Sequence, residues 1–254
     1  MPSRRTAVRA SLSALAVVTL LLGCASSKRR ELEPLESRSW RIELPVPGFA
    51  AASVALPLGA TVARPVAVVL HGARDRADWQ CGSFRGVLGG KLFILCPRGE
   101  PSEVAERFSF RSVDAAAQEL RAALSALKTH YGAHVAPGPV MLVGYDEGAF
   151  TAVELARQEP SFFSRVMLVK GDPAAFSPSS AAIFAARGGK RVLFFCTEPE
   201  CDDRAVSRAL LLSRAGAQAK SVKHDVGPYL DARFTERLRG ELPWLLEGDS
   251  RFSR

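Results

Sequence analysis

Apolar residues along this chain recur with two different periods. Between residues 40 and 246, short apolar runs alternate with longer segments in which apolar residues recur every three or four positions. The short runs predict strands and the longer segments predict helices. The predicted strands are residues 40–44, 52–56, 66–70, 91–95, 140–143, 166–169, 191–195 and 221–226. The predicted helices are residues 113–131, 147–158, 179–187, 203–215 and 232–246. This alternation predicts an α/β fold, a three-layer α/β/α sandwich with a mostly parallel sheet of about eight strands.

The first residues follow a different pattern. Three arginines, Arg4, Arg5 and Arg9, precede an apolar stretch over residues 10–22, which is typical of a secretory signal covering residues 1–23. The ending Leu-Leu-Gly-Cys resembles a lipoprotein signal peptidase site. That resemblance implies that Cys24 becomes an acylated N-terminus held in a lipid bilayer. An ordinary signal without lipid is the alternative.

The rest of the chain divides into a tether and one domain. Residues 24–38 are polar and charged and predict a flexible tether, and residues 39–254 predict the folded domain. No other apolar run approaches the ~20 residues that a membrane-spanning helix needs. We therefore expect a chain that is lipid-anchored in the bacterial cell envelope, on the periplasmic face or at the outer membrane.

Charge narrows the range of partners. The formal net charge is +8, and removal of residues 1–23 with their three arginines leaves about +5. The remaining basic residues are scattered and are not interleaved with aromatic residues, which argues against nucleic-acid binding. A modest positive excess favours anionic lipid or envelope surfaces.

Cysteine usage agrees with export. Apart from Cys24, the four cysteines are Cys81, Cys96, Cys196 and Cys201, and an even number in an exported chain indicates disulfides. Three pairings are possible, and sequence order favours Cys81–Cys96 and Cys196–Cys201. The sequence contains no Cys-x-x-Cys pair, so we predict neither a metal site nor a cofactor.

The segment Leu142 to Phe150 is the most informative of the chain. An apolar strand runs into Gly144-Tyr145-Asp146-Glu147-Gly148 and then directly into a predicted helix. This segment resembles the Gly-x-Ser-x-Gly nucleophile elbow of α/β-hydrolases. The middle residue of that elbow is the nucleophile, and here it is an aspartate.

Two further motifs strengthen the resemblance to α/β-hydrolases. His71-Gly72 closes the strand at 66–70, and Pro97-Arg98-Gly99 follows the strand at 91–95. The order of strands and helices is similar to that of small esterases and dienelactone-hydrolase-like enzymes without a cap domain, over residues 39–248.

The resemblance also implies an oxyanion hole. In this family, backbone N–H groups after the His-Gly pair and after the nucleophile bind the negative oxygen that forms during acyl transfer. The corresponding donors here are the amides of Ala73 or Arg74 and of Glu147. These donors are independent of side-chain identity, so this half of the site persists even where catalysis has been lost.

The family's catalytic base has no counterpart at the expected position. The family places histidine after a glycine that follows the last strand, and here Pro228 follows Gly227. His224 lies three residues earlier, inside the predicted last strand, about 10 Å short of the usual place. His224 is therefore either a displaced base or a structural histidine. His71, His130 and His134 are predicted to lie elsewhere.

Four acidic residues follow the later strands and are candidates for the third catalytic residue. They are Asp172, Glu198, Asp202 and Asp203. Without a histidine to orient, each also fits a helix N-cap or a surface charge, and Asp202 or Asp203 fits the start of a helix.

Two functions remain open. Haloalkane dehalogenases and epoxide hydrolases use an elbow aspartate, but they carry a cap domain and a tryptophan after the aspartate, where this chain has Glu147. Attack of a carboxylate on an ester is also unfavourable, because the anhydride formed is higher in energy than the ester. The leading hypothesis is a catalytically degenerate, anchored hydrolase fold that binds a small-molecule or envelope partner. The alternative is an active hydrolase of esters, lactones or small peptides that uses Asp146 as nucleophile or His224 as a displaced base.

Overall fold

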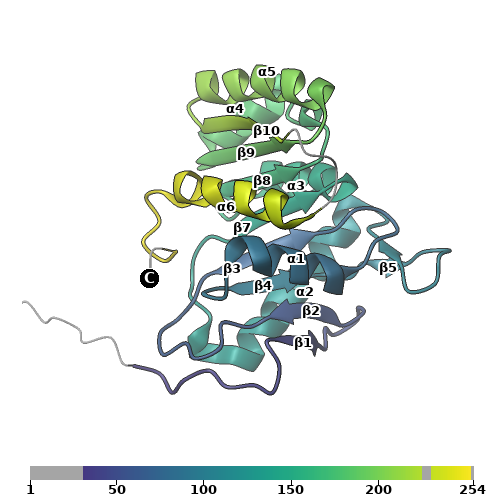
Figure 1. Cartoon of the computed structure of the whole chain (residues 1–254), viewed down its shortest axis with the longest axis vertical. Coiled ribbons are helices and arrows are strands. Elements are labelled where there is room, and N and C mark those ends of the chain that lie inside the picture. The colour runs from purple at the N-terminus through teal and green to yellow at the C-terminus, as the bar shows by residue number, and fades with distance from the viewer. Residues whose placement is uncertain (1–30, 225–229, 253–254) are drawn as a thin grey trace, which may run out of the picture. The chain divides into compact units, whose positions relative to one another are not determined.

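The computed structural model describes residues 31–224 and 230–252. Its main sheet has eight strands in the order β1-β2-β4-β3-β7-β8-β9-β10 (Figure 1). β2 is antiparallel to β1 and β4, and the other neighbouring pairs are parallel. The strands are β1 (Arg41–Leu44), β2 (Ala52–Ala55), β3 (Val66–Leu70), β4 (Phe93–Cys96), β7 (Met141–Tyr145), β8 (Arg165–Val169), β9 (Arg191–Cys196) and β10 (Gln218–Lys223). The predicted mostly parallel sheet of about eight strands is confirmed.

The central parallel strands are apolar because both of their faces are covered. Every residue of β3, β8 and β9 is buried. β10 differs, because it is the edge strand and Val222 is its only buried residue. Because the first residues of β10 are mostly polar, the apolar pattern did not mark its start. The predicted strand at 221–226 was therefore placed three residues too late.

Six helices flank the sheet in the described part of the chain. They are α1 (Ala77–Leu88), α2 (Val113–Tyr131), α3 (Glu147–Gln158), α4 (Pro178–Ala186), α5 (Pro199–Ala215) and α6 (Ala232–Leu246). α2, α3 and α6 have the predicted bounds. α1 was not predicted, because Gly82 and Gly86 interrupt its apolar pattern. α5 begins four residues before its predicted start, because Pro199 suits the first turn of a helix.

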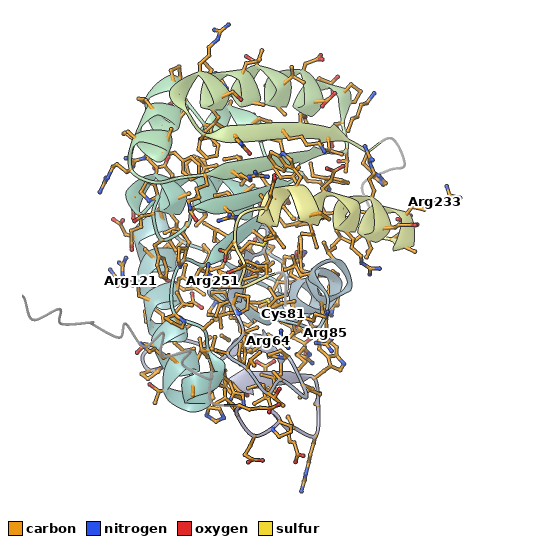
Figure 2. The ribbon with its side chains drawn as sticks, turned by 90° about the vertical axis from the view of Figure 1, so that its left-hand side faces the viewer. Arg64, Cys81, Arg85, Arg121, Arg233 and Arg251 are labelled. Atoms are coloured by element: carbon orange, nitrogen blue, oxygen red, sulfur yellow. A yellow bond between two sulfur atoms is a disulfide. The ribbon has the colours of Figure 1, made fainter. Side chains whose placement is uncertain are left out.

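Both favoured disulfides are present. Cys81 of α1 is bonded to Cys96 at the end of β4, and Cys196 at the end of β9 is bonded to Cys201 of α5. Cys81, labelled in Figure 2, is fully buried. Both bonds tie a helix to the end of a strand.

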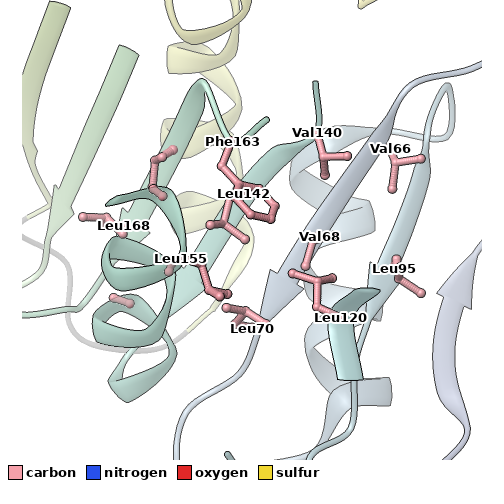
Figure 3. Close-up of a cluster of buried hydrophobic side chains, with 14 of the residues drawn as sticks. Val66, Val68, Leu70, Leu95, Leu120, Val140, Leu142, Leu155, Phe163 and Leu168 are labelled. Atoms are coloured by element: carbon pink, nitrogen blue, oxygen red, sulfur yellow. The ribbon is translucent and has the colours of Figure 1, made fainter. Parts of the chain in front are cut away.

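The sheet has a hydrophobic core on each face. α2, α3, α4 and α5 pack on one face, where branched side chains of the strands meet helix leucines (Figure 3). α1 and α6 pack on the other face, around Phe84 and Phe234. Within the described ranges, no helix is long and apolar enough to span a membrane.

A small hairpin, which the sequence did not reveal, lies between β4 and α2. Its strands are β5 (Glu100–Pro101) and β6 (Phe108–Ser109). Phe108 and Asp75 exchange backbone hydrogen bonds of 2.9 and 3.1 Å. The hairpin therefore holds the loop after β3 in place. This loop lies at the carboxyl end of the sheet, which we define as the end at which the parallel strands finish.

Candidate active site

The elbow backbone is present at the end of β7. Asp146 has φ 55° and ψ −126°, a left-handed conformation that non-glycine residues rarely adopt. Its N–H donates to the carbonyl oxygen of Val169 at 2.9 Å. A Cβ on Gly148 would lie 2.3 Å from the carbonyl oxygen of Leu70, so only glycine allows α3 to approach β3 this closely. The sequence motif therefore forms a sharp strand-to-helix turn.

Two of the predicted anion-binding amides, those of Ala73 and Arg74, already have acceptors. The Ala73 N–H donates to Oε2 of Glu147 at 2.6 Å, and the Arg74 N–H donates to Oγ of Ser109 at 2.9 Å. Glu147 is the first residue of α3, where the helix dipole favours a negative charge. A carboxylate of the protein itself thus accepts the hydrogen bond of the Ala73 amide, one of the predicted anion donors.

Negative charge accumulates around the elbow. Burial raises the pKa of the Asp146 carboxyl, and the carboxylates of Glu147, Asp75 and Glu198 raise it further. Lys170, which directly follows β8, acts in the opposite direction and lowers that pKa. The elbow therefore holds more acidic than basic groups close to Asp146.

His224 lies far from the elbow. It directly follows β10, so its predicted place inside the strand was wrong by one residue. Strand pairing aligns Tyr145 with Val222 across three strand spacings, which separates the two strand ends by about 14 Å. The buried imidazole packs 5.6 and 5.4 Å from the rings of Phe195 and Phe234, and its Nε2 has no hydrogen-bond partner among the described residues.

His71 has a structural position. Its Nδ1 lies 2.7 Å from the carbonyl oxygen of Gly72, and its Nε2 lies 2.8 Å from that of Arg98. The ring also packs against Phe110 at 4.8 Å. His71 therefore joins the loops that follow β3 and β4. All four histidines are described, and none is hydrogen-bonded to the Asp146 carboxylate.

The acidic candidates lie in separate surroundings. Asp172 accepts the Ala174 N–H at 3.0 Å, which is the predicted capping role. Asp202 accepts the Ser221 hydroxyl at 2.6 Å, in the first turn of α5. The expectation that Asp202 or Asp203 opens a helix was wrong, because Pro199 starts α5 earlier.

A buried carboxyl group that sequence reasoning missed supports the turn after β4. Glu119 of α2 accepts the N–H groups of Arg98 at 2.8 Å and Gly99 at 3.0 Å. Burial raises the pKa of Glu119, and these backbone contacts lower it. Asp75 and Lys170 were also missed, although Lys170 directly follows a predicted strand.

Several predicted features lie outside the described residues. They are Cys24 with the signal segment, the first part of the tether, and Gly227 with Pro228. Their roles stay predictions. Within residues 31–224 and 230–252, no group of acidic, histidine or cysteine side chains is arranged to hold a metal ion.

Comparison with known proteins identifies the fold. No protein-family model and no curated protein sequence matches the chain. Among solved structures, Est1E from Butyrivibrio proteoclasticus matches with a TM-score of 0.59 and 12% identity, over 82% of this chain and 99% of that chain. The chain has the α/β-hydrolase fold.

Two other neighbours agree with this α/β-hydrolase assignment. A carboxylesterase from Mesorhizobium loti matches with a TM-score of 0.56 and 19% identity, over 79% of this chain and 99% of its own. A dienelactone hydrolase-like promiscuous phosphotriesterase from metagenomic libraries also has a TM-score of 0.56, with 18% identity over 84% of this chain and 96% of its own. At such identities the likeness establishes the fold alone. The two disulfides are compatible with an extracytoplasmic location.

Proposed function

We propose that this chain is a lipid-anchored protein of the bacterial cell envelope that keeps the hydrolase fold without hydrolytic chemistry and acts by binding. One contact carries the proposal, the hydrogen bond of 2.6 Å from the Ala73 N–H to the Glu147 carboxylate. An esterase uses this N–H to stabilise the negative oxygen of its transition state. A carboxylate in the same place repels that oxygen.

The surroundings of Asp146 also support loss of catalysis. A hydrolytic nucleophile needs a base within hydrogen-bond reach, directly or through one water. Asp146 makes no hydrogen bond to an imidazole, and the His224 ring is enclosed by Phe195 and Phe234. Neither group is placed to transfer a proton.

An ester-hydrolysis assay tests the inactive site. We expect the mature chain to hydrolyse short p-nitrophenyl esters no faster than buffer, and Asp146→Ala to leave that rate unchanged. Asp114→Ala removes the same charge from an exposed position in the first turn of α2 and serves as the matched control. Hydrolysis by the wild-type chain that Asp146→Ala abolishes and Asp114→Ala preserves would contradict the proposal.

The anchor is supported by the signal pattern that ends at Cys24 and by the two disulfides. Metabolic labelling with an alkyne fatty acid tests it in cells. We expect label on the wild-type chain and none on Cys24→Ala, with mass spectrometry placing the acyl groups on the N-terminal peptide. An unlabelled wild-type chain would remove the anchor from the proposal and leave the ester assay unaffected.

Active hydrolysis of esters, lactones or small peptides is the second candidate, and the elbow backbone favours it. Asp146 keeps a left-handed conformation that is strained for a non-glycine residue, and such strain is found mainly at functional sites. A working site would require Glu147 to release the Ala73 amide. Triple substitution Asp146→Ser, Glu147→Ala and Pro228→His tests how much of that site remains. New esterase activity would indicate that only these side chains separate the chain from an enzyme.

A further inference from the structure

The described chain enters the domain at the amino end of the sheet, where the parallel strands begin. The Leu32 N–H donates to the Thr61 carbonyl oxygen at 2.8 Å, and the Leu35 N–H donates to that of Ala60 at 3.1 Å. Ala60 and Thr61 belong to the loop that leads into the start of β3. The elbow lies at the other end of the same strands, so chain entry and candidate site are on opposite sides of the domain.

The proposed anchor lies only a few residues before this entry point in the sequence. Seven residue steps separate Cys24 from Glu31. Even a fully extended chain of that length spans at most about 25 Å. If Cys24 carries lipid, which is the part of the proposed function on which this inference rests, the bilayer surface lies within that distance of the amino end.

A groove of about 950 Å³ opens at the same end, between the C-terminal ends of α1 and α6. Its apolar wall consists of Leu88, Leu92, Leu242, Pro243, Leu246 and Phe252. Pro65 also lines the groove and follows Arg64, whose N–H donates to the His134 carbonyl oxygen at 2.7 Å. Nε2 of His134 in turn lies 2.9 Å from the carbonyl oxygen of Glu33, which belongs to the entering segment. The groove and the chain entry are therefore neighbours.

The charges of the groove fit an anionic surface. Lys91 and Arg239 line it and are exposed. Its two acidic residues are neutralised by arginines: Glu247 pairs with Arg191, and Asp249 pairs with Arg251, both at 2.6 Å. Figure 2 labels Arg64, Arg85 and Arg251 among the arginines of the domain.

Two exposed apolar side chains add to this end. Trp40 precedes β1 with 37% of its surface exposed, and Leu58 follows β2 with 40% exposed. The Arg85 guanidinium lies 4.9 Å from the Trp40 ring centre. Tryptophan beside a cation is typical of side chains that settle at a membrane interface.

We propose that the amino end is a membrane-docking face, and that its partner is the phospholipid bilayer that holds Cys24. A lipid acyl chain enters the groove, and Lys91 and Arg239 lie near lipid phosphates. A short tether gives the face an effective concentration in the millimolar range at the bilayer, so weak contacts suffice. The docked domain turns its candidate site away from the membrane.

Tryptophan quenching by brominated lipid tests this orientation, because the chain carries an internal control. Trp79 begins α1 at the carboxyl end and is 52% exposed. The double variant Trp79→Phe, Trp244→Phe retains only Trp40. The double variant Trp40→Phe, Trp244→Phe retains only Trp79. Mature, acylated protein is reconstituted in vesicles of phosphatidylethanolamine and brominated phosphatidylglycerol. We expect quenching of Trp40 to exceed that of Trp79 by about twofold or more, since only Trp40 reaches the interface.

A pair of charge substitutions sharpens the test. Leu58→Asp places a charge in the docking face, whereas Val104→Asp places one on an exposed site of the hairpin at the carboxyl end. We expect Leu58→Asp to reduce Trp40 quenching and Val104→Asp to leave it unchanged. Equal quenching of Trp40 and Trp79 in protein that sediments with vesicles would overturn the docking face alone. Unmodified Cys24 with no sedimentation would overturn the anchor and the docking face together.

Discussion

Charged groups are arranged differently at the two ends of the sheet. At the amino end, the buried Arg165 donates to the carbonyl oxygens of Leu245 at 3.0 Å and Glu247 at 2.7 Å, and lies 3.6 Å from the Asp249 carboxylate. At the carboxyl end, like charges approach one another, because Glu147 raises the pKa of Asp146. Opposite charges satisfy each other around Arg165, whereas similar charges lie close together at the elbow.

This difference separates stability from function. A guanidinium at the last carbonyls of α6 matches both the helix dipole and the unpaired acceptors of a helix end, so the amino end stabilises the fold. Strained backbone and carboxyl groups with raised pKa lower stability and are retained mainly where a protein binds or reacts. The carboxyl end therefore keeps the features of a functional site even though its side chains do not form a catalytic set.

The largest effect is expected at the amino end. Arg165→Met removes the charge that satisfies two carbonyl groups and Asp249, and breaking such a buried arrangement costs about 3–5 kcal/mol. Urea denaturation measures the loss. Arg121→Met serves as control, because its pair with Glu159 is exposed and is worth less than about 1 kcal/mol. Equal losses for the two variants would show that the buried arginine has no special role.

The next effect tests the elbow backbone. Gly148→Ala places a methyl group against the Leu70 carbonyl oxygen and should destabilise the domain by about 1–3 kcal/mol through overpacking. Gly240→Ala in α6 is the matched control, because a Cβ added there would meet no heavy atom within 4 Å. Alanine there should stabilise the helix by about 0.5–1 kcal/mol. Similar thermal stabilities for both variants would contradict the tight α3–β3 approach.

Most of the backbone was predictable from the sequence, apart from α1 and the β5–β6 hairpin, whereas the polar contacts were not. Apolar runs place β3 and β7, and the glycine spacing gives the turn at Asp146, because period and glycine conformation are local properties. The contact of Glu147 with Ala73 joins residues 74 positions apart. Such a contact depends on side-chain direction, which a pattern of residue types does not contain.

The described histidines show the same limit. Along the last strand, sequence counting placed His224 about 10 Å before the usual position of the base. Across the sheet, strand pairing separates the ends of β7 and β10 by about 14 Å. What counting did not reveal is the reason for its burial, the aromatic rings of Phe195 and Phe234. Phe234 belongs to a different helix, so only the tertiary structure brings it to the imidazole.

A smaller effect is expected on the pH dependence of stability, for which we compare Asp146 at the carboxyl end with Asp249 at the amino end. The pKa of Asp146 is raised, so its ionisation opposes folding, and stability falls as pH rises through that pKa. Asp146→Asn should therefore be more stable than wild type at pH 7 and equal to it below about pH 4. The gain stays below about 1 kcal/mol, because the side chain is partly exposed to solvent.

Asp249 should respond with the opposite sign. Hydrogen bonding from Arg251 is the main cause of a lowered pKa at Asp249, so its ionisation stabilises the fold. That stability is present above the unfolded pKa of about 4 and is lost as pH falls through the folded value. Asp249→Asn should lower the melting temperature at pH 7, and the difference should shrink in acid. If Asp146→Asn and Asp249→Asn change the melting temperature at pH 7 in the same direction, ionisation of the two carboxyl groups does not have opposite effects on stability.

The smallest effect is the repulsion between Asp146 and Glu147. A double-mutant cycle with Asp146→Asn and Glu147→Gln measures it, because the introduced glutamine retains an oxygen that accepts the Ala73 N–H. Each single variant removes the same repulsion, so the double variant should gain less stability than the two single gains together, by about 0.2–0.5 kcal/mol. Salt screens charges across solvent over about 10 Å at 0.1 M and about 3 Å at 1 M, so the coupling should shrink in 1 M salt. If salt leaves this interaction free energy unchanged, it arises from the hydrogen bond between Glu147 and Ala73 and not from charge repulsion. The strain at the elbow would then be a result of backbone geometry.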